Sequence, residues 1–534
     1  MIKYKLPTKI VMWENAENME EVFVDKPLQA DFCHYDCVKI KKSGYILLDF
    51  GCELRGGIAM TVQLTSKAPK TAKCRIVFGE SVMEALSTIG QKNSLNDHAV
   101  RDMEVDIPNM STSYHGSTGF RFVKIEAIDA DIDIKTIKAK LEIKDIKYKG
   151  SFECDDEILN QIWKTGAYTV HLNMGDFIWD GVKRDRLVWI GDINPEISTI
   201  KTVFGYDDSV LNSLDFIKNK TTPNKWMNGI ATYSIWWIIN QYDWYMQQGD
   251  KEYLQEQLEY LKKLLEHIIS WVDNGFTATE DMESFVDWSS KDTDSELEGV
   301  KSIFCIGLDC AKKIFDEFGM DAQSKKCAEY SEKIRYDVSD VVVNKRVAGL
   351  NILANRNVDI SKQIIAGNSA EGMSCFIGYY ILCAKGILDD IDDALDIVRT
   401  YWGGMLKMGA TTFWEDFDIK WMENSGRIDE IVPKGKNDIH GDFGKYCYKQ
   451  FRHSLCHGWA SGPTAFLSEY VLGVKILEPG CKVVSIKPRL GNLKYARGTY
   501  PTPYGNIEIC HEVINGKINS IINAPKGIEV IMQK

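Results

Sequence analysis

The chain has 534 residues, of which 44% are hydrophobic and 26% are charged, and its formal net charge is −12. This length predicts two to four domains. The acidic balance excludes nucleic acid and anionic membrane surfaces as main partners, because both are bound through a basic footprint. No stretch reaches the roughly 18 apolar residues of a membrane span, and the N-terminus MIKYKLPTKIVMWENAENMEE lacks the apolar region of a secretory signal. We expect a cytoplasmic protein that acts on a small molecule, and homo-oligomer formation stays open.

Residues 1–150 carry the pattern of an antiparallel β-sandwich. Short runs of alternating apolar and polar residues recur, and Gly, Asn, Asp and Pro separate them. The runs are SGYILLDFG, GGIAMTVQLTS, AKCRIVFGE, FRFVKIEAI and KAKLEIKDI. We therefore predict an N-terminal β-sandwich domain over 1–150.

Residues 151–472 change to helical spacing. The clearest helix begins at Lys251, has leucine and isoleucine at every third or fourth position, and stops at Gly275. Further helices are predicted around 192–205, 229–248, 300–318, 322–338, 371–385, 389–400 and 456–471. Several, such as YSIWWIINQYDWYM, are apolar all round and must be buried on more than one side. The mixture predicts a toroid of helical hairpins with inner and outer helices.

Residues 473–534 return to strand-like runs such as VVSIKPRL, GNIEICHEVING and GIEVIMQ. We predict a small C-terminal β domain over these residues. The expected fold is thus multidomain α and β, with a central helical toroid between two β domains.

The sequence indicates neither a metal centre nor a cofactor. Fourteen cysteines are scattered without CxxC pairs, as expected of buried thiols in a reducing compartment. Cys33, His34 and Cys37 form half a metal site at most, since zinc requires four converging ligands. The dinucleotide, phosphate-loop, serine-hydrolase and zinc-peptidase motifs are all missing from the sequence.

The first candidate site is DGVKRDRLVWIGD, residues 180–192. Asp180, Asp185 and Asp192 lie between two expected helices, where ligand groups are common. Arg184 and its neighbour Arg186 can hold the acids through charge-assisted hydrogen bonds. The alternative is a solvated turn with local ion pairs. Trp189 argues against that alternative, because a large aromatic side chain is costly to expose.

The second candidate is Glu415, in GATTFWEDFD. A lone glutamate is usually a surface residue, but Trp414 and two phenylalanines surround this one with apolar bulk. Partial desolvation raises the pKa of a carboxylate and suits it to general acid or base work.

Two further stretches combine polar and aromatic side chains. RHSLCHGWASGP contains His457 and Trp459, and we expect the histidine to contact substrate or to be hydrogen-bonded in the core. SFVDWSS contains Asp287 beside Trp288, which suits contact with a sugar but equally suits a helix-terminal aspartate and a core tryptophan. Carboxylates set among aromatic residues are typical of glycoside hydrolysis.

These motifs resemble those of the α-L-rhamnosidases of glycoside hydrolase family 78. DGVKRDRLVWIGD resembles the family signature, roughly D-[CG]-x-x-R-[ED]-R-L-x-W-x-G-D, whereas TTFWEDFD and SLCHGWASGP resemble its later motifs. LDFGCELRGG and SIKPRLGNLKYARGTYPTPYGNIEI extend the likeness over most of the chain. The resemblance implies an (α/α)6 toroid flanked by β-sandwich domains, and inverting hydrolysis of terminal α-L-rhamnosides.

The resemblance also implies roles for single residues. Asp185 matches the general acid, at a position where many members have glutamate, and Glu415 matches the general base. Glu196 is an alternative acid. Residues expected to bind substrate are Asp180, Arg184, Trp189, Asp192, Asp287, Trp288, Trp414, His457 and Trp459. For the four tryptophans an ordinary role in the core is an equal alternative. Because the acid must hold its proton, we expect Arg184 and Arg186 to pair with groups other than Asp185.

Two other functions fit the same residues. One is a non-catalytic sugar-binding protein that kept the pocket and lost the acid. The other is a glycosidase or glycoside phosphorylase with the same toroid that acts on another sugar. Assays with and without phosphate separate these enzymes, and tight sugar binding without turnover identifies the binding protein.

Overall fold

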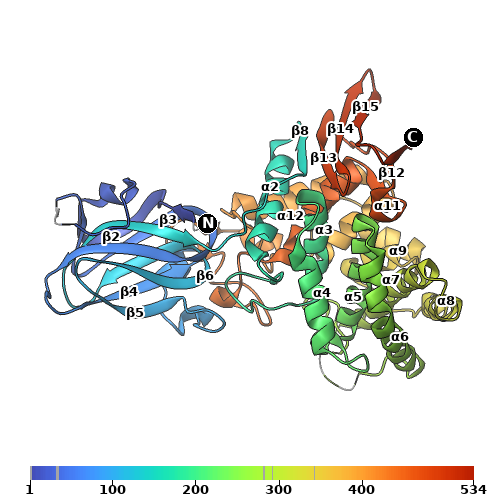
Figure 1. Cartoon of the computed structure of the whole chain (residues 1–534), viewed down its shortest axis with the longest axis horizontal. Coiled ribbons are helices and arrows are strands. Elements are labelled where there is room, and N and C mark those ends of the chain that lie inside the picture. The colour runs from blue at the N-terminus through green and yellow to red at the C-terminus, as the bar shows by residue number, and fades with distance from the viewer. Residues whose placement is uncertain are drawn as a thin grey trace.

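The computed structural model describes residues 3–31, 35–278, 280, 283–291, 293–341 and 343–533. Cys33 and His34 of the partial metal site lie outside these residues. Figure 1 shows a sheet domain beside a helical domain, with the last strands of the chain packed against the helices. Among the described residues, no helix combines the length and the apolar character needed to span a bilayer.

The N-terminal domain is a β-sandwich, as predicted. Its strands are β1 (Lys3–Lys5), β2 (Lys9–Glu17), β3 (Val38–Thr65), β4 (Ala72–Gly79), β5 (Asp102–Ile107), β6 (Ser111–Ala127) and β7 (Ile132–Leu141). They follow the order β1-β7-β3-β6-β4-β5, with β2 paired to β3. Two predicted strands, SGYILLDFG and GGIAMTVQLTS, form the single strand β3, which changes register between Asp49 and Leu54. Gly51 sits in that bend with a φ of 82°, which favours glycine.

Short helices fill the connections of this domain. They are η1 (Met19–Phe23), α1 (Val82–Leu86) and η2 (Gln91–Asn93). Ser81 caps α1 by accepting a hydrogen bond from the Glu84 backbone N–H. The segment from α1 to β5 faces the helical domain, and it supplies residues to the site described below.

The central domain is a toroid of six inner and six outer helices within the described residues. The outer helices are α2 (Glu157–Asn173), α4 (Asp208–Lys220), α6 (Lys251–Asp273), α8 (Asp321–Tyr336), α10 (Val358–Ile365) and α12 (Ile391–Lys407). The inner helices are α3 (Ile193–Val203), α5 (Ala231–Gln248), α7 (Glu296–Glu317), α9 (Lys345–Leu353), α11 (Ile377–Ile387) and α13 (Gly462–Phe466). Contacts run α3–α5–α7–α9–α11–α13 and back to α3, which closes the inner ring. This confirms the predicted toroid.

The predicted helix α6 matches the structure closely. Asp250 caps its start by accepting from the Tyr253 backbone N–H at 2.9 Å, and Gly275 follows its end with a φ of 70°. The helix predicted over 371–385 instead begins at Ile377, because Gly372 takes a φ of 73° that interrupts a helix. The segment 456–471 is divided into a 3-10 turn (Gly458–Ser461), α13 and a π-helical turn (Leu467–Val471).

The C-terminal domain packs two small sheets together. One sheet has the order β15 (Lys517–Asn523), β14 (Gly505–Ile514), β13 (Tyr495–Thr502) and β8 (Ser151–Cys154). The other has β11 (Val474–Ile476), β12 (Val483–Ile486) and β16 (Glu529–Met532). Strand β8 thus brings residues from before the toroid into the sheet that follows it. The domain contacts the end at which inner helices finish, as in the hydrogen bond from Gln247 Nε2 to the Pro501 carbonyl at 2.8 Å.

Candidate active site

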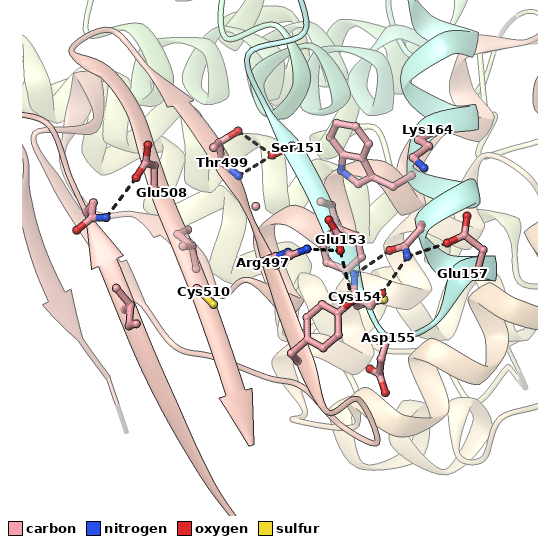
Figure 2. Close-up of a pocket in the computed structure, with 18 residues that line it drawn as sticks. Ser151, Glu153, Cys154, Asp155, Glu157, Lys164, Arg497, Thr499, Glu508 and Cys510 are labelled. Atoms are coloured by element: carbon pink, nitrogen blue, oxygen red, sulfur yellow. Dashed lines mark hydrogen bonds and ion pairs between the residues drawn. The ribbon is translucent and has the colours of Figure 1, made fainter. Parts of the chain in front are cut away.

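A hollow of about 810 Å³ lies between the C-terminal sheet and α2, but it contains none of the predicted site residues. Figure 2 shows that its polar side chains pair with one another: Arg497 with Glu153 at 2.6 Å, and the Ser151 hydroxyl with the Thr499 hydroxyl at 3.0 Å. Because these groups satisfy each other, the hollow offers few free groups to a ligand.

A second cavity, of about 240 Å³, opens at the end of the toroid where the inner helices begin. It gathers residues from the N-terminal domain and from five separate stretches of the helical domain. Its lining consists of His98, Asp180, Arg184, Asp185, Leu187, Trp189, Asp192, Ile230, Tyr233, Phe285, Trp288, Glu415, Cys447, Arg452, His457 and Trp459. Nine of the eleven predicted site residues are among these. The sequence motifs therefore converge on one cavity.

The segment 180–192 is a closed loop that leads into α3. Asp180 accepts a hydrogen bond from the Leu187 backbone N–H through Oδ1 at 2.9 Å, and its own N–H donates to the Leu187 carbonyl at 3.2 Å. At the tip, Asp185 and Arg186 both take left-handed conformations, with φ of 57° and 56°. Non-glycine residues rarely adopt this region, and they do so mainly where surrounding contacts enforce it. The loop holds Asp185 at the cavity wall.

Arg184 joins two of the acids. Its Nη2 forms a short ion pair with Glu415 Oε1, and its Nη1 lies 3.2 Å from Asp185 Oδ1. The expectation that Arg184 would avoid Asp185 is therefore wrong, because neighbours in a tight turn leave one guanidinium within reach of both carboxylates. Arg186 does pair elsewhere, with the Ser117 carbonyl at 2.9 Å. Its guanidinium also covers the Trp179 ring at 4.5 Å.

Glu415 is held on a second side by the backbone. The Ser454 N–H donates to Glu415 Oε2 at 3.0 Å, and the Glu415 N–H donates to the Ser454 carbonyl at 3.0 Å. The indole N–H of Trp459 donates to the Glu415 carbonyl at 2.9 Å. A buried carboxylate with an arginine on one oxygen and a backbone N–H on the other keeps a fixed orientation.

Asp192 lies at the start of α3, between a tyrosine and a histidine. Its Oδ1 accepts a short hydrogen bond from the Tyr233 hydroxyl, and its Oδ2 lies 3.5 Å from His457 Nε2. Burial raises the pKa of Asp192, while His457 and Tyr233 oppose the rise. The pKa of Asp180 is raised well above its usual range by burial and then by the nearby Asp185 and Asp192. A protonated Asp180 can donate a hydrogen bond as well as accept one.

Three tryptophans form aromatic walls. Trp189 packs edge-on against Tyr233, with ring centroids 6.2 Å apart. Trp288 stacks on Tyr446 at 5.9 Å, and Trp459 stacks on Phe376 at 5.3 Å. Flat apolar faces of this kind suit the face of a sugar ring, whereas the carboxylates suit its hydroxyls.

Two predicted substrate contacts, Asp287 and Trp414, are not among the lining residues. The Ser374 hydroxyl donates to Asp287 Oδ2 at 2.6 Å, and the Ser290 N–H donates to its Oδ1 at 2.8 Å. Trp414 is fully buried and packs edge-on against Phe417. Asp287 thus ties neighbouring loops together and Trp414 fills the wall behind Glu415, which are the structural roles that the sequence had left open for such residues.

Glu196, the alternative acid, does not reach the cavity. It is 0% exposed, and neither of its carboxyl oxygens has a hydrogen-bond partner among the described residues. A Cβ on Gly458 would collide with this carboxyl group, so a larger residue there would have to displace the Glu196 side chain. Burial, followed by Asp180 and Asp192, raises the pKa of Glu196 well above its usual range. Its place in the packed interior argues against proton donation to a substrate.

Comparison with known proteins agrees with this architecture. Residues 147–345 match the family model of the bacterial alpha-L-rhamnosidase 6 hairpin glycosidase domain, and residues 473–532 match that of the bacterial alpha-L-rhamnosidase C-terminal domain. An alpha-L-rhamnosidase of Alteromonas sp. (strain LOR) is 25% identical over 464 residues, which cover 77% of this chain and 47% of that protein. The helical and C-terminal domains of the chain thus match domain models of the bacterial α-L-rhamnosidases.

Solved α-L-rhamnosidases share the fold. The family 78 rhamnosidase of Bacillus sp. GL1 superposes with a TM-score of 0.76 at 21% identity, covering 92% of this chain and 53% of that one. The Streptomyces avermitilis α-L-rhamnosidase complexed with L-rhamnose gives a TM-score of 0.75 at 16% identity, with coverages of 99% and 50%. The chain thus spans about half the length of these relatives.

Sequence reasoning missed several residues that line the cavity. His98 comes from the N-terminal domain, and its Nε2 lies 3.5 Å from Asp185 Oδ1 and 3.5 Å from Asp97 Oδ2. Arg452 Nη2 lies 3.3 Å from the same Asp97 oxygen. Tyr233 lies in a run that the sequence marks only as an apolar helix. No local pattern marks His98, because the β domain brings it to the cavity only when the domains pack.

The buried Glu196 predicts a pH effect on stability. A raised pKa in the folded state means that folding favours the protonated carboxyl group of Glu196. The stability that this group contributes is therefore complete below its ordinary pKa of about 4.3, and it is lost as the pH rises toward the pKa in the folded state. Glu196→Gln is neutral at every pH. We expect the variant to gain stability relative to wild type with rising pH above about 4.3, by up to about 1.4 kcal/mol per pH unit.

Urea unfolding of both proteins at several pH values between 5 and 8 measures this difference. Parallel stability curves for the two proteins would contradict it. Turnover serves as a control, because Glu196 does not line the cavity and its replacement should leave kcat within a few-fold of wild type.

Proposed function

We propose that this protein hydrolyses terminal α-L-rhamnosides with inversion of the anomeric centre. Asp185 is the general acid and Glu415 the general base, and the leaving group belongs to a small glycoside or oligosaccharide. The observation that carries the proposal is the convergence of Asp180, Asp185, Asp192 and Glu415 on one aromatic-walled cavity. The similarity of this chain to α-L-rhamnosidases supports the choice of sugar, since one of these structures is a rhamnosidase complexed with L-rhamnose.

The size of the cavity favours a single terminal sugar. At about 240 Å³ it is smaller than the roughly 300 Å³ at which pockets for drug-sized ligands begin. Asp180 and Asp192 orient the sugar through hydrogen bonds to its hydroxyls, which lowers the entropic part of the barrier. The tryptophan walls accommodate the methyl group that rhamnose carries in place of a hydroxymethyl group.

In the proposed reaction, Asp185 gives its proton to the glycosidic oxygen while Glu415 takes a proton from the attacking water. Arg184 supports the second role, since its guanidinium provides a buried counter-charge and a fixed hydrogen bond to Glu415. The contact of Arg184 with Asp185 is longer, at 3.2 Å, and the Asp185 side chain is 20% exposed. Substrate entry on this exposed side brings the glycosidic oxygen against the Asp185 carboxyl group and excludes water.

The direct test is turnover of a panel of aryl glycosides, with product followed by proton NMR. We expect hydrolysis of the α-L-rhamnoside above all others, no dependence on phosphate, and β-L-rhamnose as the first product. A requirement for phosphate would indicate a phosphorylase, and a first product of the α configuration would indicate a retaining mechanism. Rhamnose binding without turnover would identify a non-catalytic relative.

A further inference from the structure

We propose that Glu80, a glutamate of the N-terminal β domain, is a positioning residue for the reaction. Its contacts join residues 180–192, the acid segment, to residues 451–457. We call residues 451–457 the base segment, because Ser454 within it donates a hydrogen bond to the proposed base, Glu415. The inference rests on the proposed function, and it gives a part in catalysis to Glu80, which does not line the cavity.

Glu80 reaches the acid segment through Lys183. It directly follows strand β4 and is fully buried, at 0% exposed. Its Oε2 lies 2.9 Å from Lys183 Nζ. Lys183 stands two residues before Asp185 and directly before Arg184, which contacts both Asp185 and Glu415. A shift of Lys183 therefore moves the groups that carry the chemistry.

Glu80 also reaches the base segment directly. Its Oε2 accepts from the Leu455 backbone N–H at 2.5 Å, and its Oε1 accepts from the Ser454 hydroxyl at 3.4 Å. The backbone N–H of the same Ser454 donates to Glu415 Oε2 at 3.0 Å. One serine thus separates the β-domain carboxylate from the proposed base.

Lys183 closes the connection between the two segments. Besides Glu80, its ammonium group donates to the His453 carbonyl at 2.6 Å, the Phe451 carbonyl at 3.0 Å and Glu84 Oε1 at 3.2 Å. A buried ammonium ion with four acceptors has its charge and its hydrogen bonds satisfied. If Glu80 lost its charge, the Lys183 ammonium group would lose a counter-charge and the Leu455 N–H would lose a charged acceptor. Both losses are costly in a buried network.

The network is centred on lysine and not on a metal ion. Glu80, Glu84 and His440 lie close enough together to hold a metal, but the Lys183 ammonium already lies against both carboxylates. The histidine nitrogens are also engaged, with the Ser81 hydroxyl at 2.8 Å and the His453 carbonyl at 3.0 Å. Burial raises the pKa of Glu80 to about 6, although Lys183 opposes the rise, so the carboxylate is mainly ionised at pH 7.5.

The test compares Glu80→Gln with a matched interface variant, Arg121→Met, at pH 7.5. Arg121 also joins the β domain to the toroid, through the Gly409 carbonyl at 3.0 Å and Asp429 Oδ2 at 3.5 Å. It forms a buried ion pair with Asp49 inside the β domain and lines no part of the cavity. We expect Glu80→Gln to lower kcat on an aryl α-L-rhamnoside by about 10- to 100-fold, since small displacements of reacting groups have effects of that order. KM should stay within about threefold, because Glu80 does not line the cavity.

Arg121→Met should lower the melting temperature while leaving kcat within about threefold of wild type. Adding Lys183→Met to Glu80→Gln should cost less than the sum of the two single effects, because both act through one network. Equal kcat losses in Glu80→Gln and Arg121→Met, or a kcat near wild type in Glu80→Gln, would overturn the inference. Ser454→Ala replaces Glu80→Gln if that variant does not fold. It removes the hydroxyl contacts to Glu80 and to the Cys456 backbone, and it keeps the contact of Glu80 with the Leu455 N–H.

Amide hydrogen exchange separates failure of this inference from failure of the proposed function. We expect faster exchange over residues 451–457 in Glu80→Gln than in Arg121→Met. An inactive wild-type protein overturns the proposed function. In that case, unchanged exchange over residues 451–457 in Glu80→Gln also overturns the inference that Glu80 holds this segment, whereas faster exchange there supports it.

Discussion

Glu415→Gln is expected to lower kcat on an aryl α-L-rhamnoside by about 100- to 10,000-fold, the usual contribution of a general base. Glutamine has nearly the same shape and can still accept from Arg184 or from the Ser454 N–H, but it cannot take a proton from water. The variant also leaves Arg184, which is 5% exposed, without its buried counter-charge. We therefore expect a loss of stability, with breakage of buried pairs costing about 3–5 kcal/mol, and urea unfolding measures it separately from turnover.

Asp416→Asn is the matched control for Glu415→Gln. Burial, and then Glu415, raises the pKa of Asp416 to about 7, so its carboxyl group is partly neutral near pH 7 and asparagine is a fair replacement. Asp416 is next to Glu415 in sequence but does not line the cavity. Its variant should keep kcat within a few-fold of wild type. Comparable activity in Glu415→Gln and Asp416→Asn would remove Glu415 from the chemistry.

Asp185→Asn is expected to lower kcat by about 100- to 10,000-fold on substrates with poor leaving groups, because asparagine cannot protonate the departing oxygen. Aryl rhamnosides whose phenols are already acidic need little protonation, so their loss should be much smaller. Turnover of a series of phenyl rhamnosides, plotted against the pKa of the phenol, measures the difference. This dependence on leaving group distinguishes loss of the acid from general damage to the cavity.

Asp185→Glu provides the complementary variant. It keeps the carboxyl group and adds one methylene, as at the matching position of many family members. We expect it to retain far more activity on poor leaving groups than Asp185→Asn. Equal loss across the whole series in Asp185→Asn would exclude Asp185 as the proton donor, and His98, 3.5 Å from it, would become the next candidate.

Local patterns in the chain were enough to predict most of its elements. The leucine repeat after Lys251 predicted α6, and alternating runs predicted the β domains. Both patterns arise because a helix or strand that buries one face has apolar residues at regular intervals along the chain. The two runs that merge into β3 show the limit. Whether Gly51 marks a turn or only a bend depends on the strands that pair with β3, which come from distant parts of the chain. Asp49, for example, pairs with Lys9 in β2 and with Phe122 in β6.

The candidate site divides in the same way. Asp180, Asp185 and Asp192 were recognisable because all three lie within one short motif. Asp287 and Trp414 looked equally suitable, yet their side chains lie in the packing behind the cavity. An aromatic residue beside a carboxylate has the same local signature whether it faces a ligand or the core, so only the packing of distant segments separates the two cases.

The sequence by itself determined the elements, the division into β, helical and β parts, and the chemistry of the acidic motifs, because each depends on residues close together in the chain. Tertiary structure decided which end of the toroid holds the site, since closing the inner ring brings the starts of α3, α5, α7 and α13 together. It also decided that Arg184 contacts both Asp185 and Glu415, and that His98 and Glu80 of the β domain reach the site region. Those contacts join residues up to 375 positions apart, and at such separations only the packing of whole domains determines which side chains meet.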